Sequence, residues 1–317
     1  VANEGGVGVI SSAGIGLLYR NLATDYLKAS IMGLKEELRK ARKKTQGIIG
    51  VNIMSAMSNF EDMVKTSIKE KADIIFVGAG LPLDLPKFLT PKSPTKLVPI
   101  VSSGKAARLI CMRWQERYNL LPDAFVVEGP RAGGHLGFKN DQIENPDFSL
   151  EKIMKDVIVE LQNNSIKFKK HIPVIAAGGI YDGNDMYDIM KLGADGVQLG
   201  SRFVTTEECD ASDEFKQEYI NADKNDIEII QSPVGMPGRA IHNKFITKIK
   251  DKLKQPLKCP YHCIKTCEFN KVPYCIIMAL YNACKGNMNS GYAFAGSNAF
   301  RASKIDTVKQ VFSDFIA

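Results

Sequence analysis

The chain has 317 residues, of which 44% are hydrophobic and 24% charged, and its net charge is +7. This length allows one large domain, alone or with a small one, and the composition is that of an ordinary globular protein. No apolar run reaches the roughly 18 residues of a membrane-spanning helix, and we expect no signal peptide. The densest basic run, Arg39–Lys44, is interpreted as a solvated helix end. We therefore expect a cytoplasmic protein that acts on a small molecule, without nucleic-acid or membrane binding.

The first residues, Val1–Gly6, have the pattern of a helix end that stops at a glycine pair. A domain would not begin at such a point. We therefore expect that a strand and most of a helix precede this sequence.

From Gly8 onward, short apolar strands alternate with amphipathic helices. The predicted strands are residues 8–12, 50–54, 73–77, 96–101, 124–127, 173–177 and 196–199. The predicted helices are residues 26–44, 58–71, 105–118, 150–163 and 182–192, and a last one covers residues 305–315. The strands are continuous apolar runs, which are typical of parallel strands covered by helices on both faces.

Seven strand–helix units, with an eighth in front, predict a (β/α)8 TIM barrel whose first strand is missing. An open doubly wound sheet is the alternative. Nearly every predicted strand ends in Gly, Ser or Asn, for example at Gly78 and Ser102. In a barrel all these ends converge on the face that carries the active site, whereas an open sheet needs such residues only near its switch point. We therefore favour the barrel.

The stretch from Glu128 to Gly137 follows a buried strand and contains four glycines and one of the four histidines of the chain. The glycines allow positive φ angles and close approach of the backbone to a ligand. A histidine among such small residues, His135, is a candidate for proton chemistry near neutral pH. The alternative is a flexible turn with an incidental histidine.

Two further strand ends predict a phosphate site. Gly178 and Gly179 follow one strand, and Gly200 and Ser201 follow the next. Barrels often bind phosphate with the loops after their last two strands, through backbone amides and a helix N-terminus. Asp182 is placed to cap the intervening helix. Tight packing of helix against strand is the alternative explanation.

These motifs resemble those of the nitronate monooxygenase family, formerly called 2-nitropropane dioxygenases, and of the related flavin-dependent enoyl-acyl-carrier-protein reductases. The resemblance rests on residues 3–10, 50–53, 128–137, 173–180 and 193–203, and it extends to residues 232–240. It implies a barrel that binds FMN. It also implies that the usual opening strand, with its flavin contact, is absent here.

The resemblance assigns roles residue by residue. His135 corresponds to the general base of nitronate oxidation, and Arg239 would meet an anionic substrate or serve as an ion-pair partner. The implied cofactor-binding residues lie at strand ends and in the last segment, and they are Asn52, Gly78, Ser102, Glu128, Gly133, Gly178, Gly179, Gly200, Ser201, Gly296 and Ser297. The implied organisation is an FMN-binding barrel over residues 1–205, a lid with a cysteine-rich segment over 206–285, and a return to the barrel over 286–317.

Three functional hypotheses stay open at this stage. The first is oxidation of nitronates or nitroalkanes with O2, and the second is NAD(P)H-dependent reduction of an enoyl thioester. The third is a redox or binding protein that carries an iron–sulfur cluster on a barrel scaffold. A homo-oligomer is compatible with each of them.

The third hypothesis rests on crowded cysteines, since five of the seven lie between Cys259 and Cys284. On a helix, Cys259, Cys263 and Cys267 would share one face, and Cys275 would complete four ligands for a cluster. The alternative, which we favour, is a buried stripe of small residues, a role that free cysteine fills well. In that interpretation the chain has no metal site.

Overall fold

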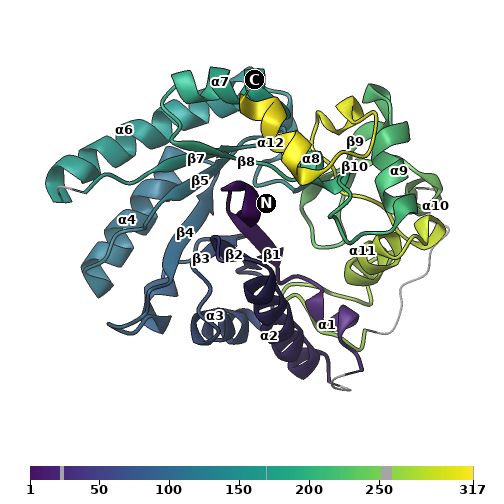
Figure 1. Cartoon of the computed structure of the whole chain (residues 1–317), viewed down its shortest axis with the longest axis horizontal. Helices are drawn as coiled ribbons and strands as arrows, with labels where there is room; N and C mark the ends of the chain where they lie inside the picture. The colour runs from purple at the N-terminus through teal and green to yellow at the C-terminus, as the bar shows by residue number, and fades with distance from the viewer. Residues whose placement is uncertain (22–24, 169, 251–258, 317) are drawn as a thin grey trace. The chain divides into compact units, whose positions relative to one another are not determined.

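A parallel sheet organises the fold (Figure 1). The computed structural model describes residues 1–21, 25–168, 170–250 and 259–316. Within these residues the parallel strands are β1 Gly8–Ser11, β2 Ile49–Met54, β3 Ile74–Gly78, β4 Lys96–Val101, β5 Phe125–Glu128, β7 Val174–Ala177 and β8 Gly196–Gln198. They hydrogen-bond in the order β1-β2-β3-β4-β5-β7-β8. This alternation of parallel strands and helices confirms the predicted α/β class of the barrel type, with seven strands in the described residues.

The described residues contain twelve α-helices. They are α1 Ile15–Leu18, α2 Tyr26–Lys44, α3 Phe60–Lys69, α4 Gly104–Tyr118, α5 Asn140–Ile143, α6 Leu150–Phe168, α7 Gly183–Lys191, α8 Ser201–Val204, α9 Asp213–Asn221, α10 Lys244–Lys250, α11 Ile276–Cys284 and α12 Val308–Ile316. Of these, α2, α3, α4, α6, α7 and α12 correspond to the six that were predicted. Asp182 caps α7 as predicted, because its side chain accepts a hydrogen bond from the Asp185 amide at 3.0 Å. In the part of the chain that the structure describes, no helix has the length and apolarity needed to cross a bilayer.

The chain forms two compact units. The first consists of residues Val1–Val127, Asp156–Val174 and Tyr261–Lys265. Its central strands are fully buried, with Val51 and Ile53 in β2 and Ile75 and Val77 in β3 at 0% exposure. Figure 1 shows α2, α3 and α4 beside strands β1–β4. The Asp73 carboxylate ties α2 to the sheet, because it accepts hydrogen bonds from Arg42 at 2.6 Å and from the Ile49 amide at 2.7 Å.

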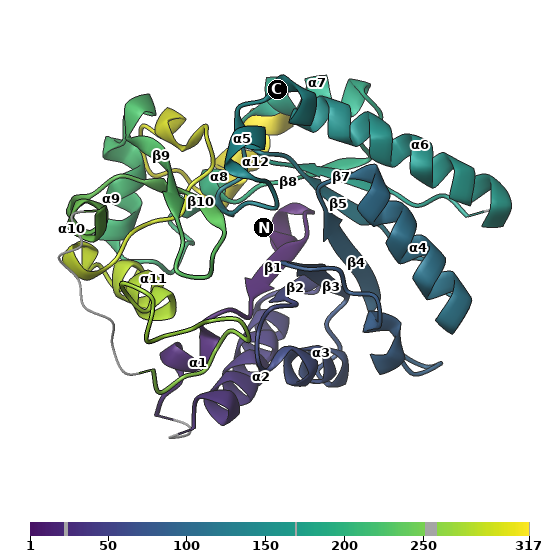
Figure 2. The same cartoon turned by 180° about the vertical axis from the view of Figure 1, so that it is seen from behind.

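The second unit consists of residues Glu128–Lys155, Ile175–Pro260 and Thr266–Ala317. It contains a three-stranded antiparallel sheet in the order β6-β10-β9, formed by β6 Gly134–His135, β9 Ile227–Gln231 and β10 Pro237–Ile241. Figure 2 shows β9 and β10 next to α9, α10 and α11. This sheet was not predicted from the sequence. Its strand β6 is only two residues long and rich in glycine, so it carries no apolar alternation.

A buried ion pair joins the end of the chain to the segment after β8. Arg202, in α8, donates to Asp306 at 3.0 Å and to Asp314 at 2.8 Å. The side chains of Arg202 and Asp306 are 8% and 6% exposed, whereas that of Asp314 is 56% exposed. Burial acts to raise the pKa of Asp306, but the hydrogen bonds and charges of Lys304 and Arg202 outweigh it and lower the pKa. The pair therefore fixes the C-terminal segment within the second unit.

We predict that Asp306→Ala destabilises the protein by about 3 kcal/mol, because it leaves a buried guanidinium with only an exposed partner. Asp314→Ala is the matched control and should cost about 1 kcal/mol or less. Thermal unfolding at pH 7 measures both effects. Because the folded pKa of Asp306 is lowered, its contribution is present above the unfolded pKa and is lost as the pH falls through the folded one. Equal stability of the two variants would contradict the central role of this pair.

Candidate functional site

The backbone places His135 through the short strand β6. The loop after β5 turns at Gly134, whose φ of +79° lies in the left-handed region that favours glycine. Strand β6 then pairs with β10, with His135 opposite Gly238, and the Leu136 amide donates to the Pro237 carbonyl at 2.9 Å. The histidine is therefore held by a sheet instead of lying in a flexible turn, which was the alternative considered from the sequence.

The ring of His135 is half-buried and has two close neighbours. Its Nε2 lies 2.7 Å from the Ser232 hydroxyl. Its ring makes a T-shaped contact with that of Phe294, with the ring centroids 5.0 Å apart and an angle of 64° between the ring planes. Burial lowers the pKa of His135 to about 4. The imidazole is therefore neutral at pH 7, and the nitrogen that carries no proton can accept one.

Glu128, the last residue of β5, is a second titratable group at this end of the sheet. Its side chain is half-buried and makes no hydrogen bond or ion pair within the described residues. Burial raises the pKa of this carboxyl group to about 7. Glu128 can therefore hold or release a proton near neutral pH, which a paired surface carboxylate cannot do.

Gly178 and Gly179 follow β7 with φ angles of +102° and +84°. A Cβ atom at Gly178 would lie 2.9 Å from the Ala132 amide nitrogen, and one at Gly179 would lie 3.0 Å from the Arg131 side chain. The loop after β5 therefore packs directly against this turn. Only glycine fits at the two positions, because the φ angles are positive and a side chain would meet that loop. Asn298 donates to the Gly179 carbonyl at 2.6 Å and holds the turn from a third segment.

The third segment also meets the loop after β8. The Gly296 amide donates to the Ser201 hydroxyl at 2.8 Å, and the Ser297 amide donates to the Arg131 carbonyl at 3.0 Å. The hydroxyl oxygen of Ser297 is buried and has no partner within the described residues. A Cβ atom at Gly200 would meet open space. We call the residues Gly178, Gly179, Gly200, Ser201, Gly296 and Ser297 the glycine cradle.

The structure thus brings His135, Gly133 and the six cradle residues together within the second unit. Glu128, at the end of β5, also lies in the second unit. The remaining three predicted residues lie in the first unit, at or near the carboxyl ends of adjacent parallel strands: Asn52 in β2, Gly78 at the end of β3 and Ser102 after β4. The Asn52 carbonyl accepts from the Ser12 hydroxyl at 2.8 Å and from the Ser12 amide at 3.0 Å. These strand ends share one edge of the sheet, as expected.

Arg239 serves as a structural partner. Its side chain is 8% exposed, and it donates to the Pro130 carbonyl at 2.9 Å. The nearest carboxylate, that of Glu144, lies 3.9 Å away on a side chain that is 87% exposed. Of the two roles considered from the sequence, the structure supports the structural one, because Arg239 holds the loop that leads to His135.

The helical cysteine stripe predicted from the sequence is wrong. The described residues 259–274 contain no helix, and Cys275 only caps the start of α11. Burial raises the pKa of both Cys267 and Cys275, and the neighbouring Cys259 adds to both shifts. Among the described residues, no group of three or more His, Cys, Asp or Glu side chains could hold a metal ion.

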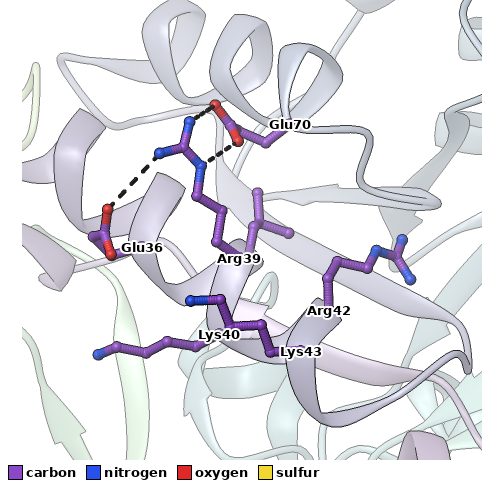
Figure 3. Close-up of a pocket in the computed structure, with 7 residues that line it drawn as sticks. Glu36, Arg39, Lys40, Arg42, Lys43 and Glu70 are labelled. Carbon is purple, nitrogen blue, oxygen red and sulfur yellow. Dashed lines mark hydrogen bonds and ion pairs between the residues drawn. The ribbon is translucent and has the colours of Figure 1, made fainter.

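A surface pocket of about 450 Å³ lies on α2, away from any predicted site residue (Figure 3). Its lining includes the basic run of residues 39–43. Arg39 donates to both oxygens of Glu70 at 2.9 and 3.0 Å, and Arg42 pairs with Asp73. The pocket is open, and ion pairs engage both arginines, so we assign it no ligand.

Two neighbours of His135, Ser232 and Phe294, were not predicted from the sequence. Ser232 lies 97 positions away in sequence, and its contact depends on the pairing of β6 with β10. Ser232 falls in residues 232–240, which carry part of the family resemblance, and Phe294 falls in the last segment, residues 286–317. Neither stretch indicates a contact with His135.

We predict opposite outcomes for two alanine substitutions at glycines of the site. A Cβ atom at Gly133 would lie 2.5 Å from the carbonyl carbon of Ala295 and 2.6 Å from the Gly296 amide nitrogen. Because backbone cannot yield as a side chain can, Gly133→Ala should destabilise the protein by about 3 kcal/mol, at the upper end of the usual cost of overpacking. Gly200→Ala meets open space and should unfold near the wild-type temperature. Equal melting temperatures would contradict the close approach at Gly133.

Known proteins resemble this chain in sequence and in fold. Among curated proteins, a (3aS,4S,5R,7aS)-5-hydroxy-7a-methyl-1-oxo-octahydro-1H-indene-4-carboxyl-CoA dehydrogenase of Rhodococcus jostii is 25% identical over 249 residues, 78% of this chain and 59% of that protein. A probable nitronate monooxygenase of Staphylococcus aureus is 34% identical over 128 residues, which cover 40% of this chain and 34% of that protein. The chain therefore spans about three-fifths of the length of the first of these relatives.

Solved structures show the same fold. FabK from Thermotoga maritima matches with a TM-score of 0.74 and 26% identity over 100% of this chain and 85% of that one. A nitroalkane oxidase from Streptomyces ansochromogenes matches with a TM-score of 0.70 and 17% identity over 100% and 89% of the two chains. The family model for nitronate monooxygenase matches residues 1–317. The chain therefore belongs to the nitronate monooxygenase family.

Proposed function

We propose that the protein is an FMN-dependent oxidoreductase that oxidises nitronates or nitroalkanes with O2. The observation that carries the proposal is the neutral imidazole of His135, fixed by β6 in the same unit as the glycine cradle. Membership of the nitronate monooxygenase family supports the reaction class. The fold alone would not, because one barrel serves many chemistries.

The residues of the cradle fit the phosphate end of FMN. Phosphate binds where backbone amides and hydroxyl groups converge and no side chain blocks the approach. Gly200 offers open space, and the buried Ser297 hydroxyl has no protein partner within the described residues. Ser201 and Gly179 complete the set. Asn52, Gly78, Ser102, Glu128 and Gly133 are the further residues proposed to contact the cofactor.

The chain itself supplies the proton chemistry. A nitroalkane has an acidic C–H bond next to its nitro group, and the base must be neutral to accept that proton. His135 meets this condition because burial keeps its imidazole unprotonated at pH 7. The C–H bond breaks, the electron pair moves onto the nitro oxygens, and the proton moves to the ring. When bound, FMN supplies the electron acceptor for the oxidation.

A second candidate is a reaction on an acyl thioester, with NAD(P)H as reductant. It is favoured by the curated relatives from Rhodococcus jostii and Mycobacterium tuberculosis, which match 78% of this chain and are both carboxyl-CoA dehydrogenases by name. The same cradle and the same histidine would serve it. Substrate tests therefore decide between the two, since the geometry favours neither.

We predict that the purified protein is yellow and releases FMN on denaturation. Gly179→Asp should abolish FMN retention, because it places a carboxylate beside a phosphate. Gly179→Asn is the matched control, since it meets the same positive φ and the same Arg131 side chain but adds no charge. Absorbance of the released flavin, per mole of protein, measures both variants. Equal flavin content would contradict the placement of the phosphate.

We further predict that His135→Asn retains FMN but loses activity on neutral nitroalkanes far more than on preformed nitronates. A general base contributes about 10²–10⁴-fold, and a nitronate has already lost its proton. His242→Asn is the control, because that histidine pairs with Glu228 on an exposed part of the second unit. In the wild type, the acid limb of the rate profile should lie near the lowered pKa of His135. Equal losses on both substrates would show that His135 does not act as a base.

A further inference from the structure

Within the described residues, the hydroxyl group of Ser232 is the one hydrogen-bond partner of the ring of His135. Their atoms Oγ and Nε2 are 2.7 Å apart. Ser232 is 3% exposed, so water does not compete for this hydrogen bond. The other ring nitrogen, Nδ1, makes no hydrogen bond within the described residues. One nitrogen is thus engaged inside the protein, and the other is left for a ligand.

A tight turn holds Ser232 in place at the end of the β9–β10 hairpin. The Ser232 amide donates to the Met236 carbonyl and the Gly235 amide donates to the Ser232 carbonyl, both at 3.0 Å. Gly235 adopts a φ of +81°, which the turn requires. The Val234 amide also donates to the Ser232 hydroxyl, at 3.4 Å. The backbone hydrogen bonds of the turn, together with the bond from the Val234 amide, therefore fix the position of the Ser232 hydroxyl oxygen.

Phe294 restricts the ring of His135 from another direction. The two rings make a tilted contact, and Phe294 itself lies against Gly238, where a Cβ atom would come within 2.8 Å of its ring. A buried tyrosine, Tyr219, donates to the Phe294 carbonyl at 2.5 Å. Rotation of the imidazole by half a turn about its Cβ–Cγ bond would exchange Nε2 with Cε1 and Nδ1 with Cδ2, and it would break the bond to Ser232.

We infer that Ser232 is a positioning residue that selects the tautomer of His135, so that Nδ1 is the nitrogen that reacts. The inference rests on the proposed role of His135 as a base. A neutral imidazole carries one proton. When Nε2–H donates to the Ser232 oxygen, the lone pair lies on Nδ1, which makes no hydrogen bond within the described residues and is left to accept a proton. The hydroxyl oxygen can accept this bond together with the one from Val234, because it has two lone pairs.

The nitrogen NMR shifts of protein labelled with 15N in histidine test the inference without any turnover. The spectrum of His135→Asn identifies the His135 signals by their loss. In the wild type at pH 7 we expect a protonated Nε2 and an unprotonated Nδ1. In Ser232→Ala we expect shifts averaged between the two tautomers, and in Ser232→Thr, which keeps the hydroxyl, a return toward the wild-type pattern. Ser67→Ala is the control, because Ser67 is also buried and its hydroxyl donates to the Met63 carbonyl instead of contacting a histidine.

Kinetics provide the second measurement. Ser232→Ala should lower kcat on neutral nitroalkanes by about 10- to 100-fold, as a misplaced catalytic group does, with little change in KM and in flavin content. A protonated Nδ1 in the wild type, or unchanged shifts in Ser232→Ala, would overturn the inference. If the shifts are as expected but the protein holds no flavin or does not oxidise nitronates, the proposed function is overturned and the tautomer assignment stands.

Discussion

The site depends on a close approach of backbone to backbone that only glycine permits. At Gly133 a Cβ atom would overlap the peptide between Ala295 and Gly296, and at Gly178 it would crowd the loop after β5. These contacts bring three segments of the second unit together, although they are far apart in sequence. Because the loop after β5 is fixed on both sides, the strand that follows it delivers His135 to a defined place. Packing of small residues, and not a large apolar core, thus determines the position of the functional group.

Electrostatics then give the fixed groups their chemical character. Burial lowers the pKa of His135 to about 4 and raises that of Glu128 to about 7. Both shifts favour the neutral form, as desolvation does for bases and acids alike. Neither group has a countercharge in the described residues that would reverse this effect. Such perturbed groups cluster where proton transfer takes place, and here they lie at the two ends of one glycine-rich loop.

Much of this arrangement could be predicted from the sequence. Continuous apolar runs such as residues 73–77, observed as β3 Ile74–Gly78, predicted parallel strands. Helix α2 has the bounds expected from its pattern, because local propensity and burial agree there. The antiparallel sheet of β6, β9 and β10 could not be predicted, since β6 has no periodic signal. The contact between His135 and Ser232 depends on that sheet. The predicted cysteine stripe was wrong because the four-residue spacing of Cys259, Cys263 and Cys267 was interpreted as helical, whereas the chain forms turns and irregular segments there.

The most direct test of the account is anaerobic titration of the flavin-loaded protein, monitored by absorbance. The account predicts that a nitronate alone bleaches the flavin, that admission of O2 restores the colour, and that NADPH alone has little effect. Rapid bleaching by NADPH, with no response to nitronate, would contradict the account and identify the protein as a nicotinamide-dependent reductase.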